Sequence, residues 1–322
     1  MKLAKMAALM PAIAGGVLMS GEVIASQVNA CDRTCLNTMM DRFVAAVTAK
    51  DPTRAPLWVG FRETVNSVVT PAGEGVWQTV TAFDPSDRRY FDPQSGNAAL
   101  LGVLSEGDAR DIVSLRIRVQ EDSISEAEWF VARRNDDSPQ GVPGELEMFD
   151  PTNMISHLPA TRVIPKQERV SRDALVAIAN SYFDGISSKN RHAVIAHPGC
   201  IRNENGLKVT GLPLDPQDAG EGVNGLTDCM AGYHHFDIAL VQERRFPVVD
   251  EEQQVALGSG VFIREAGAPK RRLHFTEYFY IDHAKLRQIE AAMFYADPFL
   301  PVPNWPPYDG NFPLPVPQYL PR

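Results

Sequence analysis

This chain of 322 residues presents the same order of elements twice, and the duplication limits its possible folds more than any local motif does. Residues 36–49 and 175–186 each carry apolar side chains three and four positions apart, which is the spacing of a helix that buries one face. After each helix come several long stretches in which apolar and polar residues alternate, as in β-strands. Because no helices separate these strands, we predict an α+β fold in which each copy is a curved antiparallel sheet wrapped over helices.

Matching landmarks follow in the same order in both copies, namely an arginine pair (88–89 and 244–245) and a late strand (124–129 and 286–291, which places Glu128 opposite Glu290). The distance between matching positions increases along the chain, because the second copy has longer loops, and loops lengthen at small entropic cost. We therefore expect a first domain over residues 31–135 and a second over 167–296. A linker rich in Asp, Pro and Gly over residues 136–166 would join them.

Proline dominates the end of the chain. Residues 297–322 contain nine of the 25 prolines, which fix φ and lack an N–H donor. We predict an extended tail over the body of the protein, although the same composition also suits a proline-rich ligand for another domain. Its aromatic residues would hold the tail in place: Trp305, Tyr308, Phe312 and Tyr319.

Residues 1–30 have the pattern of a secretory signal peptide. Lys2 and Lys5 precede an apolar stretch over residues 6–19, and small residues follow at 28–30. The pattern predicts export, so that the mature protein would be secreted or periplasmic. Lipidation at Cys31 is the lesser alternative, because Asn29 fits a lipoprotein signal poorly. No later stretch approaches the roughly 18 to 20 apolar residues of a membrane helix, so no membrane partner is expected after cleavage.

The four cysteines form an even set, as expected for disulfides in an exported protein: Cys31, Cys35, Cys200 and Cys229. Three pairings are possible, and proximity along the chain favours Cys31 with Cys35 and Cys200 with Cys229. No C-x-x-C or H-x-x-x-H motif accompanies them, so no metal site is predicted.

Charge and motifs exclude several classes of function. The 31 Lys and Arg residues against 40 Asp and Glu residues give a net charge of -9, which repels phosphate backbones, so nucleic acid is not an expected partner. The sequence also lacks the P-loop, the H-E-x-x-H helix and the G-x-S-x-G elbow. We therefore predict no cofactor.

Several segments together carry a family resemblance: 73–77, 180–184, 202–206, 244–250 and 289–291. On these segments the chain resembles the nuclear-transport-factor-2-like superfamily, whose enzymes include the SnoaL-like polyketide cyclases. It looks most like exported two-copy members of uncharacterised activity found mainly in fungi. The resemblance implies two cones, each enclosing an apolar pocket open at one end. It also implies either cofactor-independent isomerase, dehydratase, cyclase or lyase chemistry or binding without chemistry.

Glu277 is the first candidate for such chemistry. Alternation along residues 273–281 places it on one strand face with Phe275 and Phe279. Burial among apolar neighbours raises the pKa of a carboxyl group, which suits a general acid or base near neutral pH. The alternative is a structural ion pair with an arginine, for which the candidates are Arg202, Arg244 and Arg245.

Other polar residues complete the predicted sites. The segment 202–206 combines a cation, a carboxylate and two amides, which could hold a substrate oxygen or simply form a turn. Imidazole transfers protons near neutral pH, which makes His235 a further candidate. The predicted catalytic set is Glu277, Glu204 and His235, and the predicted substrate-binding set is Arg202, Asn205, Arg244, Tyr278 and Glu290. In the first copy, we expect Arg116 and Arg118 to be exposed to solvent.

Two hypotheses about function follow. The first is an exported enzyme that performs cofactor-independent acid/base chemistry on an apolar small molecule, aromatic or polyketide-like. The alternative is a non-catalytic exported protein that binds such a molecule. Many relatives of this fold pair through their sheets, so the tandem would be either a monomer paired internally or a homodimer.

Overall fold

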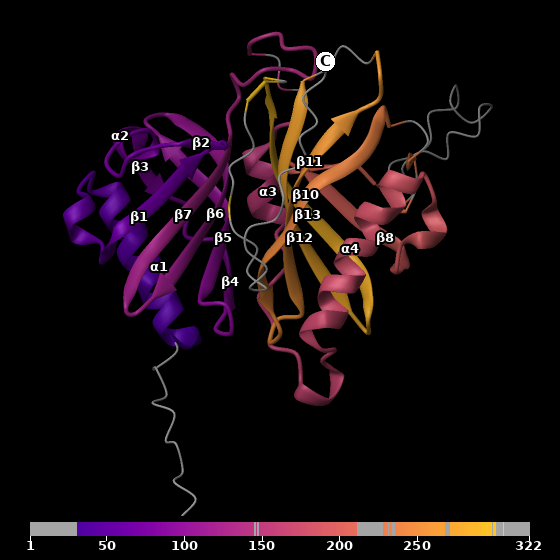
Figure 1. The fold of residues 1–322 in the computed structure, drawn as a ribbon, viewed down its shortest axis with the longest axis horizontal. Coiled ribbons are helices and arrows are strands. Elements are labelled where there is room, and N and C mark those ends of the chain that lie inside the picture. The colour runs from indigo at the N-terminus through magenta and orange to yellow at the C-terminus, as the bar shows by residue number, and fades with distance from the viewer. Residues whose placement is uncertain are drawn as a thin grey trace, which may run out of the picture.

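The computed structural model describes residues 31–144, 146, 148–210, 228–230, 232–233, 236–267, 271–297, 299–300 and 305. The predicted signal peptide lies outside these residues, as does most of the predicted tail. Figure 1 shows two successive sets of helices and strands. The first half contains α1 (Arg33–Thr48), η1 (Pro52–Arg54), β1 (Leu57–Val65), β2 (Val68–Val69), α2 (Val76–Thr79), β3 (Val80–Phe83), β4 (Arg88–Asp92), β5 (Asn97–Glu106), β6 (Ala109–Gln120) and β7 (Ser123–Ala132). The second half contains α4 (Arg172–Ser188), η3 (Arg191–Ala193), β8 (Ala196–Glu204), β9 (Leu207–Lys208), β10 (Ile238–Asp250), β11 (Val255–Arg264), β12 (Arg272–Asp282) and β13 (Lys285–Ala296). Between them lie α3 (Pro151–His157) and η2 (Lys166–Glu168).

The two predicted amphipathic helices form where the apolar periodicity places them. The side chain of Asp32 accepts a hydrogen bond from the backbone N–H of Cys35 and begins α1, and Ser171 caps α4 in the same way. Lys189, in the left-handed conformation, ends α4. The buried face of α1 includes Leu36 and Phe43, neither of which is exposed. Each helix therefore packs one apolar face on its own sheet, as the sequence predicts.

Each half is built on one curved sheet, which confirms the α+β prediction and is consistent with two cones. The strand orders are β2-β1-β7-β6-β5-β3, with β4 also paired to β5, and β10-β11-β12-β13-β8-β9. One detail of the prediction was wrong, because the sheets are mixed: β1 runs parallel to β7, and β8 runs parallel to β13. Alternation along a strand reports which face a side chain occupies but not the direction of the neighbouring strand, so the sequence could not show these parallel pairs.

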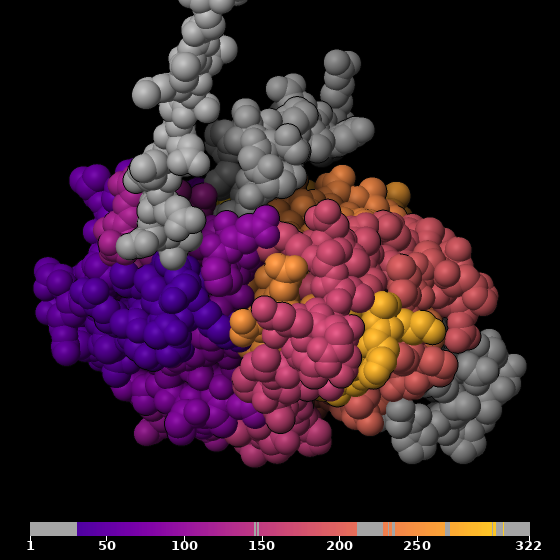
Figure 2. Space-filling model, turned by 90° about the horizontal axis from the view of Figure 1, so that it is seen from below, coloured from indigo at the N-terminus to yellow at the C-terminus, as the bar shows by residue number. Residues whose placement is uncertain are grey.

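The two sheets pack face to face, and α1 and α4 cover the faces that point away from this junction (Figure 1). The aromatic ring of Tyr90 lies 5.0 Å from that of Tyr278, and the ring of Phe130 lies 5.7 Å from that of Phe294. In the space-filling view the halves form one continuous body (Figure 2). The repeated sequence thus supplies an internal pairing of its two sheets.

The packing of the halves corrects one expectation about the first copy. Arg116 is buried, with 2% of its side chain exposed, and forms ion pairs with Glu126 and Glu128 on β7. Arg245 of the second half binds the same Glu128 through two hydrogen bonds. The face predicted to meet solvent meets the second half instead, which is why Arg116 is buried.

The segments outside the two sheets also pack against them. The predicted linker contains α3, which begins because Asp150 caps it and Pro151 occupies its first turn. Beyond the second half, Trp305 is buried, and its ring lies 4.2 Å from the guanidinium of Arg62 and 4.8 Å from that of Arg116. The other predicted anchors of the tail lie outside the described residues.

Candidate functional site

A group of buried polar side chains lies inside the second half, between α4 and its sheet. At its centre is Arg202 on β8, whose Nη1 donates a hydrogen bond to the hydroxyl of Tyr182 at 2.9 Å. Its Nε lies 3.0 Å from a carboxylate oxygen of Glu204, so the two form an ion pair. Tyr233 and Glu277 lie close enough to interact electrostatically with this arginine. We call these five residues the Arg202 cluster.

Glu277 reaches this cluster from β12. It shares a strand face with Phe275 and Phe279, and both of their rings pack 5.4 Å from the ring of Phe183 on α4. The residue is 3% exposed and makes no hydrogen bond or ion pair with any described residue, and its buried Oε2 lacks a partner. The expectation of a buried Glu277 is therefore met in the described structure.

The alternative for Glu277, an ion pair with an arginine, is not formed among the described residues, in which each candidate arginine pairs with another carboxylate. Arg202 pairs with Glu204, Arg244 pairs with Asp184 on α4, and Arg245 pairs with Glu128 across the junction. Burial raises the pKa of Glu277 to about 8, and the negative charge of Glu204 adds to the rise while Arg202 opposes it. A pKa of about 8 makes the protonated carboxyl the major form of Glu277 at neutral pH.

The remaining members of the cluster surround this acid with a cation and phenols. Burial alone would lower the pKa of Arg202, but Tyr182 and Glu204 raise it above its ordinary value, so the guanidinium stays charged. Burial raises the pKa of Tyr182 well above its ordinary value, so its hydroxyl stays protonated. That hydroxyl accepts from Arg202, and no described residue accepts its proton. The cluster thus holds an unused acid and an unused O–H donor next to a fixed positive charge.

The Cys200–Cys229 disulfide fixes one wall of the cluster, two residues before Arg202 on β8. The hydroxyl of Tyr233 donates to the carbonyl oxygen of Cys229 at 2.5 Å, so the disulfide also positions this tyrosine. The second predicted disulfide, Cys31–Cys35, is present too. Lipidation at Cys31 does not fit this structure, because its sulfur is bonded to Cys35.

Other predicted site residues lie away from the Arg202 cluster. Asn205 lies in the turn after β8. Its side-chain amide donates a hydrogen bond to the carbonyl oxygen of Met293 and accepts one from the backbone N–H of Met293. Arg244 binds α4 at the surface. The hydroxyl of Tyr278 binds Ser114 of the first half. His235 lies outside the described residues.

Glu290 also faces the junction rather than the cluster. It accepts hydrogen bonds from Asn203 and Gln288, each at 2.5 Å. Burial raises its pKa to about 7, partly offset by these two donors. The strand face of Tyr278 and Glu290 is the one that packs against the first half, opposite the face that carries Glu277.

The interior of the first half has different chemistry at the matching position. In the parallel strand pairs, Glu63 of β1 lies beside Ala127, and Arg202 of β8 lies beside Ile289. Ala127 and Ile289 are equivalent in the repeat, so Glu63 and Arg202 occupy matching positions. Glu63 is 1% exposed and accepts hydrogen bonds from the indole N–H groups of Trp77 and Trp129. Burial raises its pKa to about 7, partly offset by these two donors. A carboxyl satisfied by two tryptophans thus stands where the second half has a guanidinium.

A family model described as "Domain of unknown function (DUF8021)" matches residues 168–293. This range contains the whole Arg202 cluster and the Cys200–Cys229 disulfide, but none of the first half. No curated protein matches the chain.

No group of three or more His, Cys, Asp or Glu side chains among the described residues is arranged to hold a metal ion. None of the helices that the structure describes has the length and apolar character needed to span a bilayer.

Proposed function

We propose that the second half is the catalytic half of an enzyme that moves protons on a small, largely apolar molecule. The observation that carries the proposal is Glu277, a buried carboxyl group without a partner, beside the charged Arg202. Buried acids that no structural contact satisfies cost stability, so their presence calls for another explanation. Acid/base chemistry supplies one.

The groups of the cluster suggest a division of roles. In its ionised form, which is the minor form at neutral pH, Glu277 would take a proton from an acidic C–H of the substrate. Returning that proton to another carbon completes an isomerisation, and delivering it to a departing oxygen completes an elimination. Tyr182 would donate its free O–H to the substrate oxygen on which negative charge develops, and Arg202 would stabilise that charge through Tyr182. The surrounding phenylalanines favour an apolar, aromatic or polyketide-like substrate.

The fold and the disulfides support the wider assignment. Two curved sheets with a helix on the outer face of each fit a tandem member of the nuclear-transport-factor-2-like superfamily, and we propose this membership for both halves. Two disulfides are compatible with an extracellular location, which supports export. The internally paired sheets support a monomer.

The test begins with a ligand that co-purifies with the exported protein, identified by native mass spectrometry. The ligand is then incubated with the protein in D2O, and its C–H groups are followed by NMR. Wild type should incorporate deuterium or convert the ligand. Glu277→Gln should bind the ligand but lose at least about 100-fold in rate, as expected when a general acid or base is removed.

Glu63→Gln is the matched control, because it replaces an equally buried carboxyl in the first half. It should leave the exchange rate unchanged at temperatures where the protein is folded. Full activity in Glu277→Gln would contradict the proposed role of this residue.

A binding protein without catalysis is the second candidate. It is favoured by the fact that Arg202 is already held by Tyr182 and Glu204, as in a rigid recognition site. This candidate predicts saturable binding of the same ligand with neither deuterium incorporation nor conversion by wild type.

A further inference from the structure

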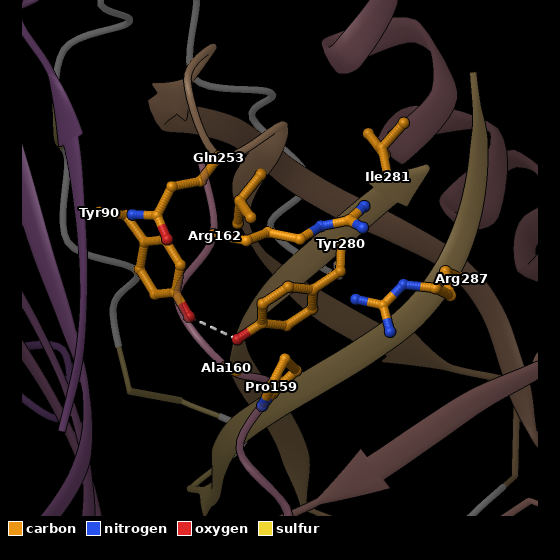
Figure 3. A pocket seen from close by; sticks show the side chains of 9 residues that line it. Tyr90, Pro159, Ala160, Arg162, Gln253, Tyr280, Ile281 and Arg287 are labelled. Atoms are coloured by element: carbon orange, nitrogen blue, oxygen red, sulfur yellow. Dashed lines mark hydrogen bonds between the residues drawn. The ribbon is translucent and has the colours of Figure 1, made fainter. Parts of the chain in front are cut away.

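A polar hollow lies at the junction of the two halves, away from the Arg202 cluster. Tyr90 of β4 and Tyr280 of β12 point their hydroxyl groups at each other across the junction, with their oxygens 2.5 Å apart (Figure 3). The guanidinium groups of Arg162 and Arg287 lie on the side of Tyr280. The enclosed part of the hollow is about 10 Å³, which is roughly the space of one water molecule.

Arg287 is the unusual member of this hollow. Its Nε is buried and has no hydrogen-bond partner, and no described carboxylate lies within ion-pair distance of its guanidinium. Arg287 as a whole is half-buried, but a donor atom that is buried without an acceptor destabilises the protein. Arg162, by contrast, pairs with Asp282 at 2.9 Å. The hollow therefore presents one cationic donor that lacks an acceptor.

The balance of charge around the hollow is positive. Asp282 pairs with Arg162 and attracts Arg287 only from beyond ion-pair distance. Arg88 and Glu290 also act on Tyr90, whose pKa Arg88 lowers and Glu290 raises. Since one tyrosine O–H donates to the other, one hydroxyl hydrogen remains available as a donor. Unused donors and a net positive charge are the requirements of a site for an anion.

We propose that this hollow between Tyr90, Tyr280 and Arg287 binds a small monovalent anion, either a halide ion or a single carboxylate group. The small volume of the hollow favours a small anion. Because residues of both halves line the hollow, a bound anion stabilises the junction as well as Arg287. This site is independent of the proposed catalytic cluster.

Thermal unfolding tests the proposal with sodium chloride or sodium acetate as probes, each titrated at constant ionic strength against bulky sodium methanesulfonate. The binding anion should raise the Tm of wild type by about 2 °C or more at saturating concentration. Arg287→Gln should abolish that rise. Arg42→Gln, which removes an exposed arginine of α1, is the control for general charge effects and should keep it.

Each outcome decides the question. A rise with chloride alone identifies a halide site, and a rise with acetate alone identifies a carboxylate site. No rise in wild type, or a rise that persists in Arg287→Gln, overturns the proposal. Crystals grown in sodium bromide provide a test that needs no variant, since an anomalous peak should lie between Arg287 and Tyr280. A water molecule there instead would overturn the halide assignment.

Discussion

Glu63 in the first half and Glu277 in the second half are both buried carboxyl groups, but they differ in their hydrogen-bond partners. Trp77 and Trp129 donate to both oxygens of Glu63, whereas Glu277 has no described hydrogen bond. Burial raises the pKa of Glu63 to about 7 and that of Glu277 to about 8. The two donors hold Glu63 in a structural role, while the proton of Glu277 remains available for chemistry.

The raised pKa of Glu277 makes stability depend on pH in a defined direction. In the unfolded chain this group ionises near pH 4.5, and in the folded protein near pH 8. Between these values the folded state binds more protons, so its contribution is fully present below pH 4.5 and is lost as pH rises through 8. Glu277→Gln should reduce this loss by on the order of 3 to 5 kcal/mol, measured by urea unfolding at pH 4.5 and pH 8.5.

Glu74→Gln, at an exposed position, controls for the removal of one carboxylate. A pH profile of Glu277→Gln that superimposes on that of wild type would show that Glu277 is ionised in the folded protein at neutral pH. That result would remove the argument for an acid in the cluster.

At the level of single residues, the sequence predicted positions better than partners. Alternation placed Glu277 among phenylalanines because a strand face depends only on neighbouring residues. The partners of a buried side chain come from distant elements. Glu63 is held by tryptophans of α2 and β7, and no spacing in the sequence reports that convergence.

Among the elements, the two disulfides constrain segments of very different length. Cys31–Cys35 spans four residues at the start of α1, whereas Cys200–Cys229 spans 29 residues and ties β8 to the segment that carries Tyr233. A longer loop loses more entropy when it is closed in the unfolded state. The second disulfide should therefore contribute more to stability, and it also positions a residue of the Arg202 cluster.

Replacing both cysteines of each pair by serine tests this difference. The loss of Cys200–Cys229 should lower the free energy of unfolding by about 3 to 4 kcal/mol, and the loss of Cys31–Cys35 by about 2 kcal/mol. Urea unfolding measures both values. Equal losses, or a larger loss for the short loop, would show that native contacts rather than loop closure determine the contribution.

Elements were predictable where their signals are local. The periodicity of α1 and α4 lies within the helices themselves, and the cysteine spacing indicated both disulfides. The helix α3 was missed inside the predicted linker, although Asp150 followed by Pro151 is a local signal for a helix start. The parallel pairs of β1 with β7 and β8 with β13 depend on where the chain returns to the sheet, which no local pattern contains.

In the whole molecule, the repeat produces a junction with matching contacts from each half. Asp92 accepts a hydrogen bond from the backbone N–H of Val249, and Asp250 accepts one from that of Phe91. The arginine that begins each long helix binds the aspartate of the other half: Arg33 binds Asp250 at 2.9 Å, and Arg172 binds Asp92 at 2.7 Å. The sequence showed the duplication, but it did not show which sheet faces meet, so the burial of Arg116 could not be foreseen.

These reciprocal contacts should make the two halves unfold together. Both aspartates are buried, and removing one partner of a buried ion pair costs about 3 to 5 kcal/mol. Differential scanning calorimetry should therefore show one transition for wild type and two for Asp92→Ala/Asp250→Ala. The double variant removes the acceptors of Arg172 and of the backbone N–H groups of Phe91 and Val249, and it leaves Arg33 only its ion pair with Glu252. Asp184→Ala breaks a pair with Arg244 within the second half and should keep a single transition. If the double variant also unfolds in one transition, the apolar faces of the sheets alone couple the halves, and the aspartates serve to set their register.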